Sequence, residues 1–256
     1  RTSYACARRI PRCRRMWRAP PSGSDAASPP GCGPAAEPGV TRVTSAAEAV
    51  RHIKSGDTVM VGGFGLVGAP LTLIDALVEL SDADELTVVS NNVGEPGRGL
   101  GKLLRQGRIR RAISSYFTSN PEAVAAVNEG RLEATLLPQG TLAEGIRAAG
   151  AGIAGFYTRV GAGTLLSEGK EHREFDGQLH VLEAPIRADV ALVYAARADE
   201  LGNLWYRRTA RNFNPAMATA ATLTIAEAGE IMAVGVLEPE SIVTPHLYVD
   251  YLVQGT

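Results

Sequence analysis

The sequence predicts a single α/β domain over residues 41–256, built on an open, mostly parallel sheet with helices on both faces. Two observations predict this fold class. Short, continuous apolar runs alternate along the chain with segments of helical periodicity. Within each run, apolar residues follow one another with no polar residue between them, as is typical of strands that are covered on both faces.

The first helix of the predicted domain begins with a capping box, Ser45–Glu48. The run Val59–Val61 is the first buried strand. A glycine-rich turn follows this strand, and Pro70 opens the next helix. The apolar face of that helix is expected to consist of Leu71, Ile74 and Val78.

Three more strands are expected in the first half of the domain, namely Leu86–Val89, Ile109–Ser115 and Leu132–Leu137. Between the last two, Asn120 caps a helix that begins at Pro121 and ends before Gly130. After the last strand, Thr141–Glu144 is interpreted as a second capping box at the start of another helix.

The rhythm changes after Gly150. Glu174–Leu182 is expected to form a hairpin with an Asp-Gly turn. Buried strands are expected at Ala188–Tyr194, Thr222–Ala226 and Ile231–Val236. Residues 41–256 contain no linker-like stretch, so one domain is the better interpretation.

Residues 1–40 differ from the rest in composition. They contain seven of the fifteen prolines, all three cysteines and seven arginines, without apolar periodicity. Such a segment buries too little surface to offset its ordering entropy, so it is expected to be disordered. Arg1–Arg18 resembles a mitochondrial transit peptide, but a basic arm or a mis-called extension upstream of Met16 are alternatives.

Charge and composition exclude some function classes. Residues 41–256 carry 19 Lys and Arg against 25 Asp and Glu, which is not the footprint of a nucleic-acid-binding protein. They contain no cysteine, and the four histidines lack metal-ligand spacing, so no metal site is expected. No apolar run reaches membrane-spanning length. A cytoplasmic location is expected, or the mitochondrial matrix if the basic start is a transit peptide.

The turn after the first buried strand is rich in glycine. Its residues are Gly62, Gly63, Phe64, Gly65, Leu66, Val67 and Gly68. The spacing Gly-x-Gly-x-x-Gly is that of a dinucleotide-binding loop, so an NAD(P)-binding oxidoreductase is an alternative. However, that class needs a carboxylate after the second strand, where this chain has Ser90-Asn91-Asn92. A turn that only allows close packing explains one or two glycines, whereas four favour a ligand that approaches the backbone.

Residues Gly56–Pro70 also resemble the first signature of the family I CoA-transferases, as found in their A subunits. Further matches follow in the family's order. They are Ser90–Asn92, Gly99–Gly101, Ser115-Tyr116, Pro138–Glu144, Gly161–Thr164, Glu168–Gly177 and Ala210–Pro215. The resemblance covers residues 41–256. Ser55 and Thr118 depart from the family pattern, and Thr118 leaves the shape of the loop at 117–120 open.

The resemblance implies a fold shared with isomerases of the ribose-5-phosphate type and a reaction centre between two related subunits. It also implies that the nucleophilic glutamate lies in a Ser-Glu-Asn-Gly motif on the partner B subunit. This chain has no such motif, so no catalytic nucleophile is expected in it. Its nearest acids, Glu95, Glu129 and Glu144, fit helix ends or exposed turns. Coenzyme A thioester is expected as a substrate, with no permanently bound cofactor.

By the same resemblance, Asn91, Asn92, Tyr116 and Gln139 match active-site positions, with the glycine loop near substrate or CoA. Amides and a phenol can hydrogen-bond a carboxylate or a 3-oxo group without acting as nucleophiles. The structural alternatives are a simple turn for the asparagines, loop hydrogen bonds for Gln139 and plain packing for Tyr116.

The expected activity is therefore CoA transfer from succinyl-CoA or acetyl-CoA to a short 3-oxoacid such as acetoacetate, together with a B subunit. 3-Oxoadipate is the alternative substrate. Two alternatives belong to other classes: a regulatory subunit, and a sugar-phosphate isomerase of the same fold, which needs carboxylates near the glycine loop. The cluster of Arg207, Arg208 and Arg211 is interpreted as a solvated face rather than a CoA-phosphate site, and Ala210–Pro215 as structural.

Overall fold

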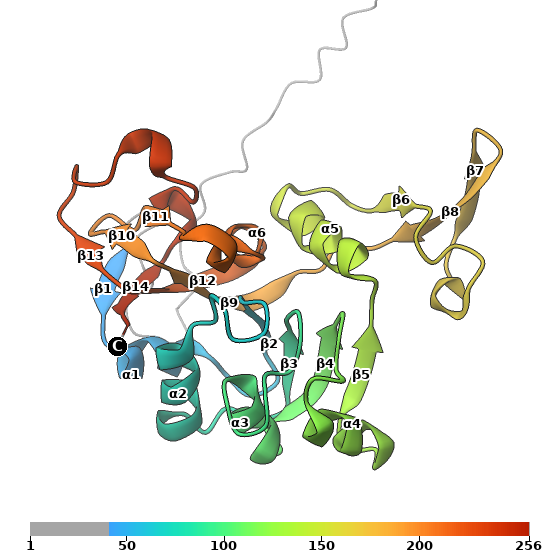
Figure 1. Ribbon diagram of the computed structural model, residues 1–256, viewed down its shortest axis with the longest axis horizontal. Helices are drawn as coiled ribbons and strands as arrows, with labels where there is room; N and C mark the ends of the chain where they lie inside the picture. Colours follow the sequence, from blue (N-terminus) through green and yellow to red (C-terminus); the bar gives the residue numbers. More distant parts are fainter. Residues whose placement is uncertain (1–40, 256) are drawn as a thin grey trace, which may run out of the picture. The chain divides into compact units, whose positions relative to one another are not determined.

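The structure is a computed structural model, and it describes residues 41–255. The expectations for residues 1–40 lie outside the described residues. The main sheet is parallel throughout, in the order β1-β14-β12-β9-β2-β3-β4-β5 (Figure 1). Its strands are β1 (Arg42–Thr44), β2 (Thr58–Val61), β3 (Leu86–Val89), β4 (Ile109–Ser114), β5 (Glu133–Leu136), β9 (Ala188–Ala195), β12 (Ala221–Ala228) and β14 (Tyr251–Gln254).

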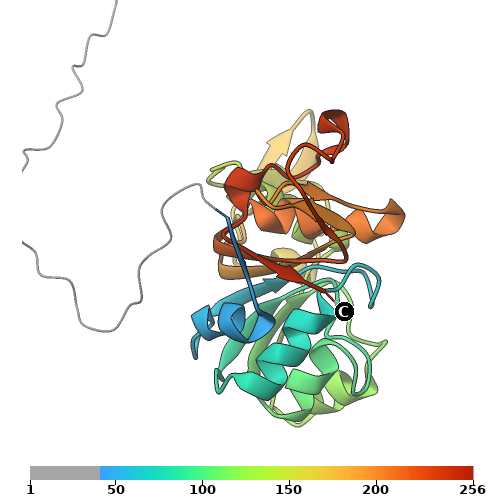
Figure 2. The same cartoon turned by 90° about the vertical axis from the view of Figure 1, so that its left-hand side faces the viewer.

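Helices cover both faces of this sheet, as predicted. One face carries α1 (Ala46–Ala49), α2 (Leu71–Leu80), α3 (Leu100–Arg105) and α4 (Pro121–Asn128). The other carries α5 (Gln139–Gly150), α6 (Asn214–Ala218) and a small sheet of β10 (Arg197–Asp199), β11 (Leu204–Trp205) and β13 (Ile231–Met232) (Figures 1 and 2). Short 3-10 turns lie at Val50–His52, Leu165–Ser167, Arg208–Arg211, Pro239–Ser241 and His246–Tyr248.

Successive side chains of β2 pack into two different hydrophobic cores, one on each face of the main sheet. In β2, Val59 and Val61 pack in the core of α1 to α4, whereas Met60 packs in the core of α5 and α6. All three side chains are buried. This explains why the strand is a continuous apolar run, because successive side chains point to opposite faces that are both covered.

The predicted hairpin is confirmed. Strand β7 (His172–Phe175) pairs antiparallel with β8 (Gln178–Glu183), and β6 (Phe156–Thr158) adds a third strand. Asp176 and Gly177 both have positive φ, +50° and +71°, as a two-residue turn between twisted strands requires. Figure 1 shows this small sheet next to α5.

The capping box predicted at Thr141–Glu144 is wrong. Helix α5 already begins at Gln139, with Pro138 at the capping position, so Thr141 lies inside the helix and is buried. Glu144 instead forms an ion pair with Arg147 at 2.7 Å. Proline favours the start of a helix because its φ is already fixed. With Pro138 at this position, α5 begins three residues before the start that a cap at Thr141 predicts.

Two further expectations need correction. The buried face of α2 is made by Leu73, Ile74 and Leu77, whereas Leu71 is exposed at its first turn. The strand expected over residues 231–236 is limited to Ile231–Met232, because Gly235 adopts φ +86° and turns the chain. Strands β1 and β14 and the short helices α3 and α6 were not predicted. Among residues 41–255, no helix has the length and apolar character that crossing a bilayer requires.

Candidate functional site

The carboxyl ends of four neighbouring strands carry the residues that the sequence singled out. The glycine loop follows β2, Ser90–Asn92 follows β3, Ser115-Tyr116 follows β4, and Gln139 begins α5 shortly after β5. The strands are adjacent and parallel, so these segments lie along one edge of the sheet (Figure 1). Open α/β sheets bind their ligands at this edge.

Asn91 and Gln139 are in direct contact. The Nδ2 atom of Asn91 donates to Oε1 of Gln139 at 3.2 Å and to Oγ of Ser115 at 3.0 Å. Asn91 is only 3% exposed, whereas Gln139 is exposed. The buried carboxamide of Asn91 therefore holds the exposed carboxamide of Gln139 in place. Both residues are among the substrate-binding candidates predicted from the sequence.

Asn92 has a different role from Asn91. Its Oδ1 accepts a hydrogen bond from the Gly94 N–H at 3.0 Å, which is the turn interaction considered from sequence. Asn92 also lines a small niche of about 10 Å³ together with Gly62 and Gly65. The glycine loop and the segment after β3 are thus packed against each other.

Tyr116 is not a core residue. Its side chain is 52% exposed, and the neighbouring Phe117 is buried in its place. The loop at 117–120 closes as a turn, in which the Asn120 N–H donates to the Phe117 carbonyl at 3.0 Å. Thr118, which departs from the family pattern, is exposed on this turn.

The glycine loop folds back on itself at its tip. The Phe64 N–H donates to the Val67 carbonyl at 3.0 Å, and the Val67 N–H returns a bond to the Phe64 carbonyl at 3.2 Å. Gly65, between them, adopts φ +61°. Phe64 and Val67 are each 52% exposed, so the tip presents apolar side chains to its surroundings.

Two asparagines hold the base of the glycine loop. Oδ1 of Asn212 accepts from the Gly63 N–H at 3.1 Å, and Nδ2 of Asn214 donates to the Gly68 carbonyl at 2.9 Å. A Cβ added at Gly62 would lie 1.8 Å from Oδ1 of Asn214. The motif Ala210–Pro215, interpreted from sequence as structural, thus shapes the loop, and close approach explains why Gly62 has no side chain.

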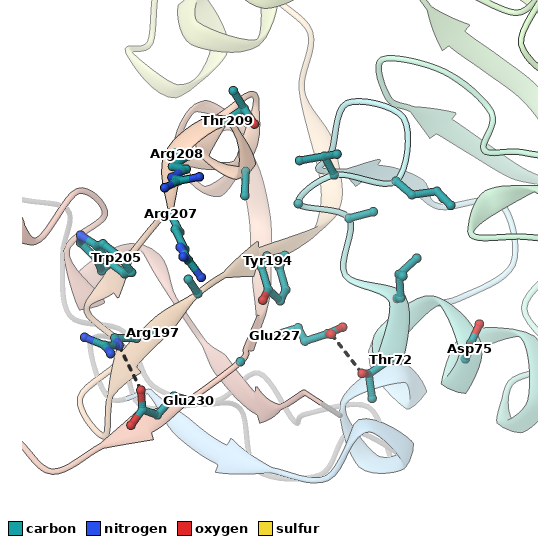
Figure 3. A pocket seen from close by; sticks show the side chains of 18 residues that line it. Thr72, Asp75, Tyr194, Arg197, Trp205, Arg207, Arg208, Thr209, Glu227 and Glu230 are labelled. Atoms are coloured by element: carbon teal, nitrogen blue, oxygen red, sulfur yellow. Dashed lines mark hydrogen bonds and ion pairs between the residues drawn. The ribbon is translucent and has the colours of Figure 1, made fainter.

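A cleft of about 1200 Å³ lies beside the glycine loop and is lined by Leu66, Val67 and Gly68 of that loop (Figure 3). Gly68, Tyr194 and Trp205 are among its lining residues. Arg207 and Arg208 also line it, are exposed, and form no ion pair with any described carboxylate. Figure 3 shows Arg207 extending between Trp205 and Tyr194.

The sequence reasoning missed Glu227, a buried carboxyl that lines this cleft. It accepts from the Leu73 N–H at 3.1 Å and from Oγ1 of Thr72 at 3.0 Å, so it caps the first turn of α2 (Figure 3). Burial raises the pKa of Glu227, and these hydrogen bonds oppose the rise. The available signal was an acid inside the apolar run of β12.

Glu227 places a carboxyl group in the cleft beside the glycine loop, where the isomerase alternative needs one. Of the acids considered from sequence, Glu95 lies in the loop after β3 and Glu129 at the end of α4, as expected, whereas Glu144 lies inside α5. They form ion pairs with Arg98, Arg131 and Arg147. Within residues 41–255, no three His, Cys, Asp or Glu side chains are grouped as metal ligands would be.

A parallel α/β sheet with a glycine loop and amide side chains along its carboxyl edge is the arrangement in which open α/β proteins bind small ligands. Residues 43–255 match the coenzyme A transferase family. The chain belongs to this family.

Relatives of this family are similar over most of the chain. The A subunit of a probable succinyl-CoA:3-ketoacid coenzyme A transferase from Bacillus subtilis is 51% identical, over 83% of this chain and 89% of the relative. The A subunit of a 3-oxoadipate CoA-transferase from Acinetobacter baylyi is 47% identical, over 80% and 91%. The alpha subunit of an acetate CoA-transferase from Escherichia coli is 42% identical, over 83% and 96%.

Solved structures share the fold. An acyl-CoA transferase from Escherichia coli O157:H7, in a thioester complex with CoA, superposes with a TM-score of 0.73 at 23% identity. The match covers 85% of this chain and about half, 48%, of that chain. Glutaconate coenzyme A-transferase from Acidaminococcus fermentans has a TM-score of 0.73 at 18% identity, over 84% and 76% of the two chains. The predicted fold class is confirmed.

Proposed function

We propose that the chain is the A subunit of a heteromeric CoA-transferase that moves CoA from succinyl-CoA or acetyl-CoA to a short 3-oxoacid such as acetoacetate. The names of the relatives from Bacillus subtilis and Escherichia coli support this assignment. The observation that carries it is the amide pair Asn91–Gln139 at the carboxyl edge of the sheet. The candidate acids Glu95, Glu129 and Glu144 are held in ion pairs with arginines.

The chemistry requires a carboxylate nucleophile, which we assign to a glutamate in a Ser-Glu-Asn-Gly motif of the partner subunit. It attacks the thioester carbonyl, and the C–S bond breaks to give a mixed anhydride and CoA thiolate. The thiolate attacks the glutamyl carbonyl, which releases the free acid and leaves glutamyl-CoA. The carboxylate of the 3-oxoacid then attacks that thioester and expels CoA thiolate, which gives a second mixed anhydride. The thiolate attacks the 3-oxoacyl carbonyl of this anhydride, which forms the new acyl-CoA and releases the glutamate carboxylate. Such covalent catalysis gives ping-pong kinetics.

In this scheme the described chain supplies hydrogen bonds rather than the nucleophile. Because Oε1 of Gln139 already accepts from Asn91, its Nε2 group is left to donate to a developing oxyanion. Tyr116 and Phe64 lie exposed along the same edge, where we place the contact with the partner. CoA is a substrate in this proposal and no cofactor is retained.

The cleft beside the glycine loop fits the other end of CoA. Its exposed guanidinium groups, Arg207 and Arg208, have no carboxylate partner among the described residues, and guanidinium groups bind phosphate well. We therefore place the CoA phosphates at these two arginines. This differs from the sequence-based interpretation of the arginine cluster as a solvated face. In steady-state assays, the double variant Arg207→Ala/Arg208→Ala is expected to raise the KM for acyl-CoA about tenfold and leave the KM for the 3-oxoacid unchanged. If the double variant and the wild type have the same KM for acyl-CoA, the CoA phosphates do not bind at these arginines.

The decisive experiment is to purify the chain alone and with a B subunit that carries the motif, and to assay CoA transfer. Transfer is expected only from the mixture, and activity of the chain alone contradicts the proposal. In the heteromer, Gln139→Ala is expected to lower kcat about a hundredfold, because one oxyanion donor is typically worth that much. An unchanged rate favours a purely regulatory subunit instead.

Two rival activities can be tested in the same preparation. The relative from Acinetobacter baylyi favours 3-oxoadipate, so kcat/KM for 3-oxoadipate and acetoacetate should be compared directly. Glu227, near the glycine loop, is the feature that keeps the isomerase alternative open. Its carboxyl is occupied as the cap of α2, so we expect no ribose-5-phosphate isomerisation by the chain alone.

A further inference from the structure

Ser115 bridges two segments at the carboxyl edge of the sheet, after β3 and after β4. Its Oγ donates to the backbone carbonyl of Asn91 at 3.2 Å, and its N–H donates to the same carbonyl at 3.2 Å. Its Oγ also accepts from Nδ2 of Asn91 at 3.0 Å. One serine therefore contacts both the backbone and the side chain of the buried asparagine.

These contacts determine which way the carboxamide of Asn91 faces. A serine hydroxyl has one proton, and here that proton is given to the Asn91 carbonyl. Toward the Asn91 side chain, Oγ is then an acceptor, so the atom that faces it must be Nδ2 rather than Oδ1. The orientation of the amide follows from the number of protons available.

The orientation of Asn91 in turn determines that of Gln139. The second proton of Nδ2 goes to Oε1 of Gln139, which turns the Nε2 group of Gln139 outward. Among the described residues, neither Nε2 of Gln139 nor Oδ1 of Asn91 has a hydrogen-bond partner. The edge therefore presents one donor, from Gln139, and one acceptor, from Asn91.

We propose that Ser115 is a positioning residue that fixes the hydrogen-bond polarity of the site, so that Gln139 presents its N–H donors to the substrate carbonyl. This inference rests on the proposed CoA-transferase function. Without the hydroxyl, the Asn91 amide can flip, and a flipped amide turns Oε1 of Gln139 outward. An outward oxygen repels an oxyanion instead of stabilising it.

The test is steady-state kinetics of the heteromer with succinyl-CoA and acetoacetate. Ser115→Ala is expected to lower kcat by about ten- to a hundredfold with both KM values within twofold, because the oxyanion forms only in the transition state. Ser115→Thr retains the hydroxyl and is expected to restore kcat to within about threefold. Ser119→Ala, which changes an exposed serine of the same segment, is the matched control and should leave kcat unchanged.

A double-mutant cycle separates positioning from a general structural role. In the Asn91→Ala background, Ser115→Ala is expected to change kcat by less than about twofold, because there is no amide left to orient. Independent, multiplicative losses overturn the proposal, and so does a fall in Tm that Ser115→Thr does not reverse.

The two proposals fail in different ways. A heteromer of wild-type chains that transfers no CoA contradicts the proposed function itself. An active wild-type heteromer in which Ser115→Ala keeps its full kcat overturns only the positioning role of Ser115.

Discussion

At Glu227 a carboxyl group is buried where the first turn of α2 needs a hydrogen-bond acceptor. Pro70, at the capping position, makes no side-chain cap, so a residue 154 positions from Leu73 supplies it. The acceptor comes with a cost, because burial disfavours the charged form. The pKa of Glu227 is therefore raised in the folded chain.

This raised pKa gives a pH dependence of stability with a defined sign. The folded chain holds the Glu227 proton more tightly than the unfolded chain, so stability falls as pH rises from the ordinary carboxyl value through the raised one. The free energy of unfolding of the wild type, relative to Glu227→Gln, is expected to fall across this window in urea titrations. Glu144→Gln is the control with the opposite slope at lower pH, between the lowered and the ordinary carboxyl value, because Arg147 lowers the pKa of Glu144. A wild-type advantage that grows with pH contradicts the prediction.

Gly62 is the second residue with a strong expectation. Gly62→Ala places a methyl group against the Asn214 carboxamide and is expected to lower the free energy of unfolding by about 1–3 kcal/mol. Gly140→Ala is the matched control, because its methyl group meets open space in α5 and alanine favours a helix by up to about 1 kcal/mol. Urea denaturation measures both, and equal effects refute the steric explanation.

Single residues were predictable from sequence where a local pattern carried the information. Asn91 and Gln139 follow strands and match family positions, and the structure brings them together. Ser115 and Glu227 acquire their roles from partners on other elements, 24 and 154 residues away. No spacing in the sequence reports such contacts.

At the scale of elements, Asn120 both caps a helix and joins two loops. Its Oδ1 accepts from the Glu122 N–H at 3.1 Å, and its Nδ2 donates to the Val93 carbonyl at 3.0 Å. The side chain is fully buried. The sequence predicted the cap, whereas the second bond depends on the tertiary fold.

Asn120→Ala is therefore expected to cost more than loss of an exposed cap. We expect about 2–3 kcal/mol, because the Val93 carbonyl and the Glu122 N–H both lose a buried partner. Ser45→Ala removes an exposed cap of α1 and should cost about 0.5–1 kcal/mol. Equal costs in chemical denaturation contradict the argument.

Element prediction succeeded for long apolar runs and failed for short or shifted elements. β3 was predicted to the residue, because its four buried positions admit no other periodicity. The start of α5 was misplaced, because a plausible cap at Thr141 competed with Pro138. β1 is three residues long and exists through its pairing with β14, which no local signal reveals.

At the scale of the whole molecule, three exposed apolar side chains lie along the carboxyl edge of the sheet. Phe64, Val67 and Tyr116 are each 52% exposed there. Exposed apolar side chains beside polar groups often mark a protein interface. We expect the partner subunit to cover this edge.

Phe64→Ser tests this expectation. The variant chain should unfold within about 0.5 kcal/mol of the wild type, because the side chain is already exposed. Its affinity for the B subunit, measured by titration calorimetry, should fall at least tenfold, about 1.4 kcal/mol. Leu80→Ser is the control, because Leu80 is similarly exposed at the other end of α2. Equal losses of affinity contradict this placement of the interface.

The order of strands in the main sheet constrains when each strand can pair while the chain is being synthesised. β1 lies at the edge and pairs with β14, and the central β2 pairs with β9. A chain that emerges from the ribosome therefore presents β1 and one side of β2 long before their partners are synthesised. We expect β2 to β5 to remain only partly protected until β9 is synthesised, and β1 to remain unpaired until β14 is synthesised, which makes the nascent chain a natural client for chaperones.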